Sequence, residues 1–509
     1  MAQCIILTGG TQAPDHTSRI QRSLGPYRIA SALEDAGYST FVLDFIIHFS
    51  IDEIKSVLKN HLTEETIWVG FSSTFFWRND NSTVITDPKD KMYYTSMDNI
   101  DSLISFIKNN SAAKLLYGGA KAPFSLVDPR IDYYVIGYSD NSVVELTKAI
   151  ETNNINSLVD IKEHIIEDQI SYIIDSNKYP EPKLDNITTY WWNKHFNVLP
   201  KEGLPIELAR GCIFKCKFCT YPLLGKKKGT YLRDASLIGE EMIKMWEAHG
   251  TTSYYFTDDT FNDDNDKIEA LHKVFTSLPF KPKFSSYLRL DLINKFPHQA
   301  DLLTEMGLIG TYFGIETFQA DSAKAIGKGL APNKVKDRLY WLDEKWKNTV
   351  NIGAGFILGL PYDTHAYFDE LIKWCMQPDV PLQQISFYPL FLFQRTGDSA
   401  ERLKEYSSEF SLHPEIYGYE FQTNNIEWSL PSQNLSYNEC KQIANQFSRI
   451  RFPHNKVAEF QMITNLNVGI PLEDLYNLTE IQIYEKYDMK TLNKNRLTEY
   501  KHMIGLENF

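Results

Sequence analysis

Short apolar runs alternate with amphipathic stretches along the first 150 residues of the chain. The apolar run at 4–8 is typical of a buried strand, and similar runs predict strands at 40–43, 66–71, 114–117 and 133–136. Apolar residues at helical spacing predict helices from about 26 to 36, and near 51–60, 98–109 and 142–150. Because the strands alternate with helices, this segment predicts a parallel, doubly wound α/β sheet, on which ligands bind outside the carboxyl ends of the strands.

The same alternation returns after residue 200. Apolar runs predict strands at 253–256, 283–288, 310–316, 350–358 and 384–388, and the helices between them include 333–347 and 365–376. The first helix of this segment begins at Asp234 or Ser236, which are N-cap residue types, and ends at Gly250. A repeated strand–helix unit predicts a parallel α/β barrel, with active residues at the carboxyl ends of its strands.

Two segments lack this pattern. Residues 151–200 mix Asn-rich and Lys-rich stretches with short apolar ones, and the Tyr-Pro-Glu-Pro sequence at 179–182 interrupts any helix, so we expect a connector. Residues 401–509 predict helices at 436–450 and 472–487 and contain no metal-ligand or nucleophile motif. The pattern therefore divides the chain into a Rossmann-like domain at 1–150, a connector, a barrel at 201–400 and a mostly helical C-terminal domain.

Composition narrows the class of protein. The chain has 509 residues, enough for two or three domains, and its 43% hydrophobic and 23% charged residues are ordinary for a soluble protein. A formal net charge of −13 argues against a broad nucleic-acid surface, which needs a basic footprint. No apolar run approaches the roughly 18 residues of a membrane span, and the start has no signal-peptide layout. We therefore expect a cytoplasmic protein with no membrane partner.

Three of the six cysteines, Cys212, Cys216 and Cys219, fall within eight residues. Thiolates are soft ligands that suit iron–sulfur clusters and zinc, but a structural zinc site needs a fourth ligand, and no convincing Cys or His partner stands nearby. Three thiolates would leave one iron of a [4Fe–4S] cluster with an open coordination position. The other three cysteines are expected to be buried small hydrophobic residues: Cys4, Cys375 and Cys440.

The Cys-x3-Cys-x2-Cys spacing, with Phe218 just before the last cysteine, resembles the signature of the radical S-adenosylmethionine (SAM) enzymes. The sequence Glu-Leu-Ala-Arg-Gly at 207–211 also looks like the strand end that precedes the cluster loop in that family. The resemblance implies that SAM chelates the open iron and is cleaved to methionine and a 5′-deoxyadenosyl radical. It further implies a partial barrel of six repeats and a reductant such as flavodoxin or ferredoxin.

Groups at the strand ends of the barrel match the family's SAM-binding motifs in order. Asp258 and Asp259 follow an apolar strand, where carboxylates can accept hydrogen bonds from an ammonium or a ribose hydroxyl; helix capping is the alternative. Arg289 can clamp the SAM carboxylate as a planar fork, and the alternative is a surface ion pair. The resemblance places three further residues at the SAM site: Phe218, Glu316 in the fourth-strand motif, and Leu360 in the fifth-strand motif.

The order of elements in the first domain resembles the cobalamin-binding domain that precedes many radical SAM domains. Its strand ends supply the candidate cobalamin-binding residues Thr8, Gly9, Ser72, Ser73, Gly118, Gly119, Gly137 and Tyr138. The Asp-x-His-x-x-Gly motif of classical cobalamin domains is absent, since His16 directly follows Asp15. Many radical SAM relatives also lack that His and hold cobalamin without a protein ligand. The alternatives are a domain retained for structure or substrate binding, and glycines that only make tight turns.

Together these features predict a radical SAM enzyme, and the cobalamin-type domain favours methylation of an unactivated carbon. Without cobalamin, the same core would carry out a rearrangement, a cyclisation or an oxidation. A third hypothesis is a non-catalytic binding protein stabilised by a metal or a cluster. Methylthiotransferases also join a Rossmann-like domain to a radical SAM core, but they place three cysteines in that domain, where this chain has only Cys4. No motif indicates the substrate.

Overall fold

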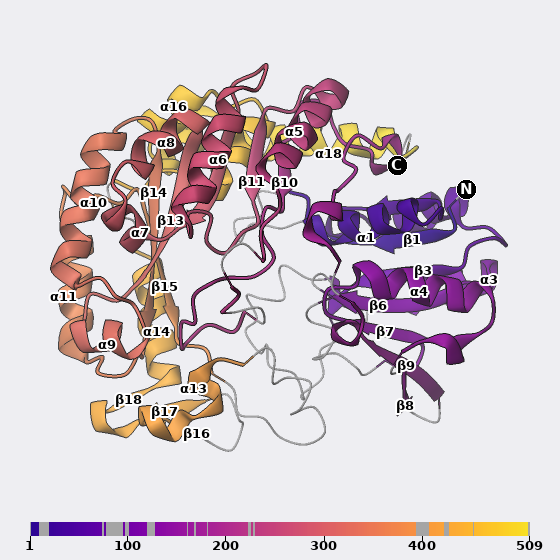
Figure 1. The fold of residues 1–509 in the computed structure, drawn as a ribbon, viewed down its shortest axis with the longest axis horizontal. Coiled ribbons are helices and arrows are strands. Elements are labelled where there is room, and N and C mark those ends of the chain that lie inside the picture. Colours follow the sequence, from indigo (N-terminus) through magenta and orange to yellow (C-terminus); the bar gives the residue numbers. More distant parts are fainter. Residues whose placement is uncertain are drawn as a thin grey trace. The chain divides into compact units, whose positions relative to one another are not determined.

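The computed structural model describes residues 2–9, 20–73, 76–77, 95–96, 101–119, 128–159, 161–166, 169–180, 182–221, 225–227, 230–392, 407–421, 427–450, 452 and 454–506. The chain forms two compact units (Figure 1). The first comprises residues 1–202, 244–250 and 488–509, and the second comprises 203–243 and 251–487. Each unit is built around its own parallel sheet.

The first unit contains a seven-stranded sheet in the order β2-β1-β3-β6-β7-β9-β8, with β8 antiparallel at one edge. Its strands are β1 (Cys4–Leu7), β2 (Thr40–Leu43), β3 (Trp68–Ser72), β6 (Lys114–Gly119), β7 (Tyr133–Ile136), β8 (Lys162–Ile166) and β9 (Gln169–Asp175). Two short strands, β4 (Phe76–Trp77) and β5 (Thr95–Ser96), pair separately. The α-helices of this unit are α1 (Leu24–Asp35), α2 (Ile51–His61), α3 (Asp101–Asn110), α4 (Asp140–Glu151) and α18 (Met489–Met503).

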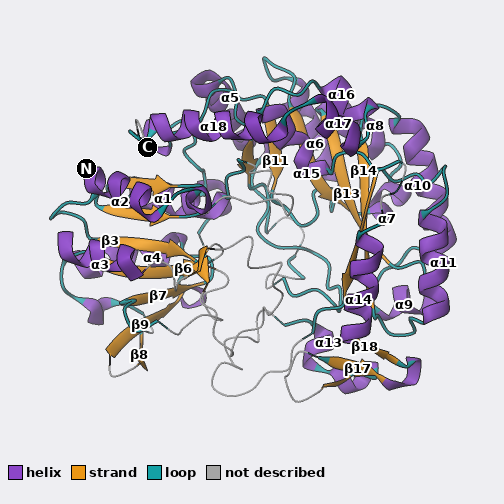
Figure 2. Cartoon of the chain, turned by 180° about the vertical axis from the view of Figure 1, so that it is seen from behind, coloured by secondary structure: helices purple, strands orange, loops and turns teal. Residues whose placement is uncertain are grey.

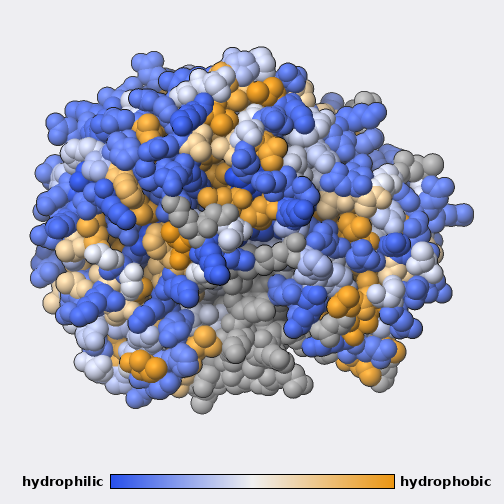
Figure 3. All heavy atoms as spheres, in the orientation of Figure 1, coloured by the Kyte–Doolittle hydropathy of each residue, from blue (hydrophilic) through white to orange (hydrophobic). Residues whose placement is uncertain are grey.

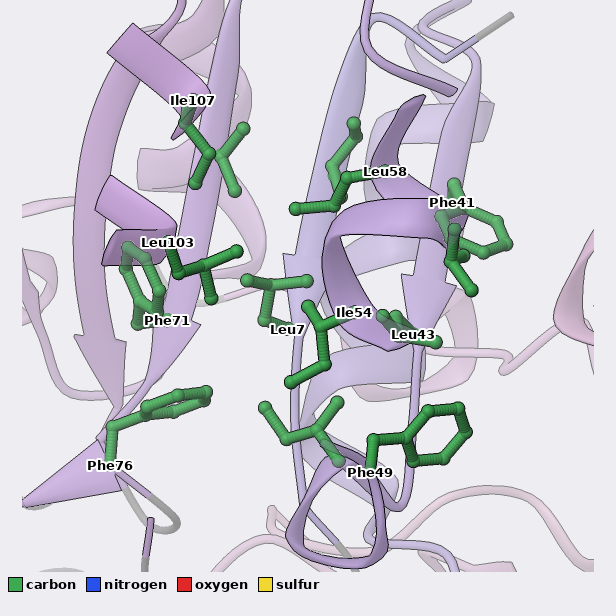
Figure 4. Close-up of a cluster of buried hydrophobic side chains, with 14 of the residues drawn as sticks. Leu7, Phe41, Leu43, Phe49, Ile54, Leu58, Phe71, Phe76, Leu103 and Ile107 are labelled. Carbon is green, nitrogen blue, oxygen red and sulfur yellow. The ribbon is translucent and has the colours of Figure 1, made fainter. Parts of the chain in front are cut away.

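One part of the core of the first unit lies between the sheet and the helices α2 and α3 (Figure 4). Leu7 and Leu43 of the strands lie beside Ile54 of α2, and Phe71 of β3 lies beside Leu103 of α3. All five side chains are at most 1% exposed. Full burial of a side chain of this kind contributes about 1.5–3 kcal/mol, so this layer holds the helices on the sheet.

A buried ion pair joins the two ends of the first unit. The guanidinium of Arg22 donates to Glu202 through Nε (2.8 Å to Oε1) and Nη2 (3.1 Å to Oε2), and both side chains are at most 1% exposed. The guanidinium carbon also lies 5.3 Å from the ring centre of Tyr500 in α18. The Tyr500 hydroxyl accepts a hydrogen bond from the Asp44 amide at 3.0 Å. Tyr500 therefore links α18 to the residue that follows β2, and the Arg22–Glu202 pair lies against its ring.

The second unit contains a six-stranded parallel sheet in sequential order. Its strands are β10 (Leu204–Ile206), β11 (Ser253–Phe256), β12 (Lys283–Leu288), β13 (Leu308–Glu316), β14 (Asn351–Leu358) and β15 (Gln384–Pro389). The helices that connect them are α5 (Ala235–His249), α6 (Asn265–Thr276), α7 (Leu290–Lys295), α8 (Gln299–Met306), α9 (Ala320–Ala325), α10 (Pro332–Trp346) and α11 (His365–Cys375). Figure 2 shows α10 and α11 along the outer face of this sheet, which is the layout of a partial (β/α)6 barrel.

The chain beyond β15 adds helices and a small sheet to the second unit. These elements are α13 (Glu409–Leu412), β16 (Glu420–Phe421), β17 (Trp428–Leu430), β18 (Leu435–Ser436), α14 (Tyr437–Ser448), α15 (Glu459–Asn467), α16 (Leu472–Asn477) and α17 (Glu480–Lys486). Helix α15 packs on the inner face, because a Cβ on Gly310 of β13 would lie only 3.0 Å from the Cα of Glu459. The side-chain amide of Asn351 donates to the carbonyls of Val457 (3.3 Å) and Leu475 (3.2 Å), which fixes this segment at the first residues of β14.

The surface is consistent with the composition. On the face that it presents, Figure 3 shows hydrophilic residues over much of the described surface and hydrophobic residues in smaller separate areas. Among the described residues, no helix combines the length and the apolar character that crossing a bilayer would need.

The predicted fold class is confirmed, and most strands agree with the structure within two residues. Three segments differ from expectation. Residues 162–175, placed in the connector, form β8 and β9 of the first sheet, and α18 joins the first unit instead of the C-terminal domain. The single helix expected at 472–487 is two helices, because Thr479 caps α17 through a capping box with Gln482.

Replacing Glu202 with Ala should leave the Arg22 guanidinium buried without its carboxylate. Breaking a buried pair in this way costs about 3–5 kcal/mol. We expect the first unit to lose stability by this amount, measured by hydrogen exchange of the amides in β1, β2 and β3. The matched control is Glu499→Ala, because Glu499 is 55% exposed in its pair with Arg496 and such pairs contribute at most about 1 kcal/mol. Equal losses in both variants would contradict this role of Arg22.

Candidate active site

The three clustered cysteines lie on a loop that follows β10 in the second unit. Two backbone hydrogen bonds pair the start of this loop with a later segment: the Arg210 amide donates to the Tyr231 carbonyl and the Arg233 amide donates to the Leu208 carbonyl, both at 2.8 Å. Between them the chain turns at Gly211, whose φ of +123° is unfavourable for residues with a side chain. The turn therefore brings Cys212 back toward the carboxyl end of the sheet.

Ion pairs at the base of the loop hold it in this position. Arg210 donates to both carboxylate oxygens of Glu207, at 2.8 and 2.9 Å. Arg233 donates to the Glu207 carbonyl at 2.7 Å and to the carboxylate of Glu241 at 2.8 Å, and the Arg233 and Glu241 side chains are at most 2% exposed. Two-point contacts of this kind fix orientation as well as distance.

The three thiols are neighbours on this loop. Burial raises the pKa of the Cys219 thiol to about 11, and the charges of Cys216 and Cys212 contribute to the rise. Burial also raises the pKa of Cys212, whose Sγ lies 3.9 Å from the Thr260 hydroxyl. Within the described part of the chain, no three or more His, Cys, Asp or Glu side chains are gathered as ligands of a single ion. Three thiols on one loop are the donor set of a cluster held by three thiolates, in which each thiolate binds a different iron.

Arg289 approaches the loop from the end of β12. Its Nε and Nη2 donate to the two carboxylate oxygens of Asp291, at 3.0 and 2.7 Å, and its Nη1 donates to the Cys216 sulfur at 3.4 Å. The guanidinium carbon lies 3.7 Å from the ring centre of Phe214. The Arg289 amide donates to the side chain of Asn262 at 2.8 Å. The planar fork predicted to clamp the SAM carboxylate is thus paired with Asp291, while the third nitrogen faces a thiol.

Glu316 is the last residue of β13 and therefore lies, like Arg289, at the carboxyl edge of the sheet. A register shift lies between Gly314 and Glu316, and Glu316 has a φ of +67°. Lys328 Nζ lies 3.6 Å from its carboxylate and donates to the Gly314 carbonyl at 2.6 Å. Burial raises the pKa of Glu316, and the charges of Lys328 and Arg289 oppose that rise. Glu316 is therefore an acceptor held close to Arg289.

The two adjacent aspartates after β11 have different environments. Asp258 is 3% exposed, its Oδ2 accepts a hydrogen bond from the Leu208 amide at 3.3 Å, and burial raises its pKa to about 7. Asp259 is exposed to solvent, and the protein around it raises the pKa of its carboxyl to about 6 through desolvation. Its charge also acts on the thiols of Cys212 and Cys219. Asp259 is thus placed to meet a ligand, while Asp258 supports the strand end that carries the loop.

The turn after β14 is held by a carboxylate that sequence reasoning missed. Asp363 Oδ2 accepts hydrogen bonds from the amides of Gly359 and Leu360, both at 3.0 Å, and Oδ1 accepts from the Ser322 hydroxyl at 3.0 Å. Leu360 is fully buried. Gly359 has a φ of +94°, and a Cβ there would lie 2.2 Å from the ring of Trp428. The C-terminal segment therefore packs directly on the turn that carries Leu360.

The second unit brings most of its predicted site residues together. The cysteines, Asp259, Arg289 and Glu316 are linked by the contacts and charges described above, and Phe218 lies half-buried on the same loop. Residues that support them were missed because each acts on a neighbour rather than on a ligand. The missed residues are Asn262, Asp291, Lys328 and Asp363. A basic residue between two glycines, Gly-Lys-Gly at 327–329, was the one available signal for Lys328.

The predicted cobalamin-binding residues lie at the carboxyl ends of strands in the first unit. The first five strands of that sheet have the order of a flavodoxin-like sheet, whose ligand crevice lies where β1 adjoins β3. Thr8 and Gly9 follow β1, and Ser72 and Ser73 lie at the end of β3. The hydroxyls of Thr8 and Ser73 are buried and make no hydrogen bond within the described part of the chain. Two such groups at the crevice fit a ligand with hydrogen-bonding side chains.

The remaining candidates of this set line the neighbouring strand ends. Gly118 and Gly119 end β6, and Gly119 has a φ of +120° with the Ser73 hydroxyl 2.8 Å from where its Cβ would stand. Gly137 follows β7 with a φ of +90°, and the next residue, Tyr138, is 38% exposed. These glycines therefore lie where a side chain would contact a neighbouring strand or turn, and the left-handed backbone of Gly119 and Gly137 is one that glycine adopts without strain. His16 lies outside the described residues.

Comparison with known proteins defines the class of the second unit. Residues 206–375 match the model of the radical SAM superfamily. The segment from the end of β10 to α11, with its three cysteines, therefore belongs to that superfamily. The family implies a [4Fe–4S] cluster and SAM.

The curated relatives are distant. The ribosomal protein uS12 methylthiotransferase RimO of Rhodopseudomonas palustris is 22% identical over 37% of this chain, and the match spans 47% of its own length. The bacteriochlorophyllide d C-8(2)-methyltransferase of Chlorobaculum tepidum is 22% identical over 51% of this chain and 54% of its own. This chain thus aligns with only about half the length of these relatives.

Solved structures show the fold over a larger part of the chain. The cobalamin-dependent SAM radical enzyme OxsB matches 99% of this chain and 72% of its own, with a TM-score of 0.57 and 13% identity. The radical SAM methyltransferase TsrM from Kitasatospora setae, with cobalamin and a [4Fe–4S] cluster bound, matches 76% of this chain and 75% of its own, with a TM-score of 0.53 and 18% identity.

Replacing any of Cys212, Cys216 or Cys219 with Ala should abolish the cluster, because each would supply one of three thiolate ligands. Iron and acid-labile sulfide per chain, measured after anaerobic reconstitution, should fall to near zero. The matched control is Cys4→Ala, a fully buried cysteine of β1 in the first unit. That variant should retain the iron of the unaltered protein. Full iron content in any of the three loop variants would contradict the assignment.

Replacing Arg289 with Met should lower the reduction potential of the cluster. Hydrogen bonds to cluster sulfurs tune the potential, and a positive donor favours the reduced, more negative form. A charged hydrogen bond of about 1.5 kcal/mol corresponds to roughly 60 mV for one electron. Potentiometric titration followed by electron paramagnetic resonance measures the shift. Arg338→Met in α10 is the control and should leave the potential unchanged, whereas an unchanged potential in Arg289→Met would refute this contact.

Proposed function

We propose that the second unit cleaves SAM reductively and directs the resulting carbon radical to a C–H bond of a substrate. A bound [4Fe–4S] cluster and SAM supply the one-electron chemistry that forms a 5′-deoxyadenosyl radical. The observation that carries the proposal is the convergence of three thiols with Arg289, Glu316 and Asp259 at the carboxyl ends of parallel strands. A one-electron donor such as flavodoxin or ferredoxin would be the partner.

The side chains of the site have distinct roles in this proposal. The three thiolates would hold the cluster, and the carboxylates of Asp259 and Glu316 would accept hydrogen bonds from the ammonium or ribose hydroxyls of SAM. The turn at Leu360, fixed by Asp363, would back the adenine. The charge of Lys328 opposes the rise that burial causes in the pKa of Glu316. These contacts would position the reactive carbon and exclude water from it.

We further propose that the chain is a cobalamin-dependent methyltransferase that acts on an unactivated carbon. Three findings support this finer function. The Thr8 and Ser73 hydroxyls lie at the ligand crevice of the first sheet, where cobalamin would supply a methyl group that its cobalt can carry. The fold of OxsB, a cobalamin-dependent enzyme, spans this whole chain. Methyltransferases also occur among the distant curated relatives.

The RimO relatives raise methylthiotransfer as another candidate, and the first unit argues against it. Its one cysteine among residues 1–150, Cys4, is fully buried in β1. Burial raises the pKa of this thiol far above its usual range. A second cluster of the methylthiotransferase type would need three accessible cysteines in that domain. Radical chemistry without cobalamin, leading to a rearrangement, a cyclisation or an oxidation, is left as the alternative that the following experiment separates.

Anaerobic reconstitution with iron, sulfide and hydroxocobalamin tests both levels of the proposal. We expect a four-iron cluster and about one bound cobalamin per chain. With SAM and dithionite, the protein should form 5′-deoxyadenosine, because the radical is quenched slowly even without substrate. Formation of 5′-deoxyadenosine without bound cobalamin would refute the methyltransferase and leave the radical SAM function. A loaded cluster that yields no 5′-deoxyadenosine would refute both.

Removing the hydroxyls of Thr8 and Ser73 tests the proposed cobalamin site itself. The double variant Thr8→Val, Ser73→Ala should bind hydroxocobalamin about tenfold or more weakly, since each hydrogen bond contributes about 1 kcal/mol. Equilibrium dialysis measures the affinity, and iron content should stay unchanged. Thr152→Val, at an exposed position after α4, is the control. Equal affinity in the double variant and the control would show that cobalamin does not contact these hydroxyls.

A further inference from the structure

The inner face of the second sheet carries a polar and aromatic group that the SAM chemistry leaves unused. Tyr287, Tyr312, Gly353 and Gln384 stand in one register row across β12, β13, β14 and β15. The rings of Tyr287 and Tyr312 meet edge to face, with centroids 5.7 Å apart. Because side chains alternate along a strand, this row faces the same side as Gly314 of β13. The Glu316 carboxylate lies over the Cβ position of Gly314, so it is on that side too, despite the register shift between the two residues. The row and the predicted SAM residues therefore share one surface.

Glycines in β14 make room for the ring of Tyr312. A Cβ on Gly353 would lie 2.9 Å from Cδ2 of Tyr312, and a Cβ on Gly355 would lie 2.3 Å from its hydroxyl oxygen. Tyr312 thus lies flat across two positions that no other residue type could occupy without moving it. Its hydroxyl points along the inner face instead of into the helices outside the sheet.

A carboxyl group reaches the same place from the C-terminal segment. Glu459 is the first residue of α15, and its Oε2 lies 3.2 Å from the Cβ position of Gly353. The side-chain carbonyl oxygen of Gln384 lies 3.1 Å from that same point. Glu459 is 4% exposed, and its charge contributes to raising the pKa of Tyr287 and of Tyr312. Two acceptor groups, from α15 and β15, therefore converge over Gly353 beside the ring of Tyr312.

Two tyrosines present this group to the interior of the barrel. Tyr287 is 45% exposed and Tyr388 is 56% exposed. Tyr388 faces the same way as Gln384 but lies four residues closer to the carboxyl end of β15, and its charge contributes to raising the pKa of both Tyr287 and Tyr312. Tyr312 precedes Glu316 by four residues on β13, which is about 13 Å along a strand. A substrate in contact with the reactive carbon of SAM near Glu316 would reach this depth with its far end. Aromatic faces backed by a buried carboxylate attract cations, because the ring quadrupole and the charge act in the same direction.

We propose that Tyr287, Tyr388 and Glu459 bind a protonated amine or guanidinium at the far end of the substrate. This proposal rests on the radical SAM function above and names the substrate class of that same site. Asp259, Glu316 and Glu459 lie on or near this face, and the nearby cations Arg289 and Lys328 are paired with carboxylates. A phosphorylated or carboxylated end group would therefore be repelled. The C-terminal segment, through α15, is the part of the chain that selects the substrate.

Three probes that carry different end groups on the same phenylethyl unit test the proposal without turnover: 2-phenylethylamine, 2-phenylethanol and 3-phenylpropionate. Calorimetry with the reconstituted full-length protein and SAM should show the amine binding at least about tenfold more tightly than the alcohol, with no binding of the carboxylate. Equal binding of the amine and the alcohol, tighter binding of the carboxylate, or binding of none of the three would overturn the proposal.

Two variants keep this test independent of folding. Glu459→Gln preserves shape and should remove the preference for the amine, while Tyr388→Leu alters only an exposed ring and should weaken the amine alone. Glu473→Gln, at an exposed position in α16, is the matched control and should bind like the unaltered protein. A preference that survives Glu459→Gln would refute the role of this carboxyl. Failure of the radical SAM function would be seen in a different experiment: the protein reconstituted with its cluster would form no 5′-deoxyadenosine from SAM and dithionite.

Discussion

The constraint on which the second unit depends is the presentation of three sulfurs at the carboxyl edge of a parallel sheet. Thiols on a free loop would not converge, so the chain restrains this loop at its base. Gly211 permits the turn, paired backbone amides align it with residues 231–233, and the Glu207 carboxylate is held by Arg210. Side chains from β12 and β13 can then approach from a fixed direction. The chemistry of the site follows from that restraint.

Charged groups around this loop are paired before any ligand arrives. Arg289 lies between Asp291 and the Cys216 sulfur, and Lys328 lies beside Glu316. Pre-paired groups need little rearrangement when a cofactor binds, and rigid positioning of this kind is what proteins contribute to cofactor chemistry. Arg289 is one example. Its fork is paired with Asp291 and its remaining nitrogen faces the Cys216 sulfur, while its contact with the SAM carboxylate stays a prediction.

The C-terminal part of the chain supports both units. Helix α18 completes the core of the first unit, where Tyr500 lies against the buried Arg22. Helix α15 lies on the inner face of the second sheet, and Trp428 packs on the turn after β14. A segment predicted as a mostly helical C-terminal domain thus supplies structural contacts to one unit and candidate substrate contacts to the other. Its lack of a motif is understandable, because packing and long-range contacts leave no fixed spacing in a sequence.

The sequence by itself determined the two alternating strand–helix patterns, the cysteine spacing and the order of the strand-end motifs. These are local properties: buried strands are apolar runs, helices bury one face, and ligands on one loop keep a fixed spacing. Only the tertiary structure decided that β8 and β9 extend the first sheet, that α18 returns to it, and that Asp258 faces the strand layer while Asp259 faces outward. The physical reason is that such contacts join residues distant in the chain. Their energy depends on which surfaces meet after folding, and no short window of sequence contains that information.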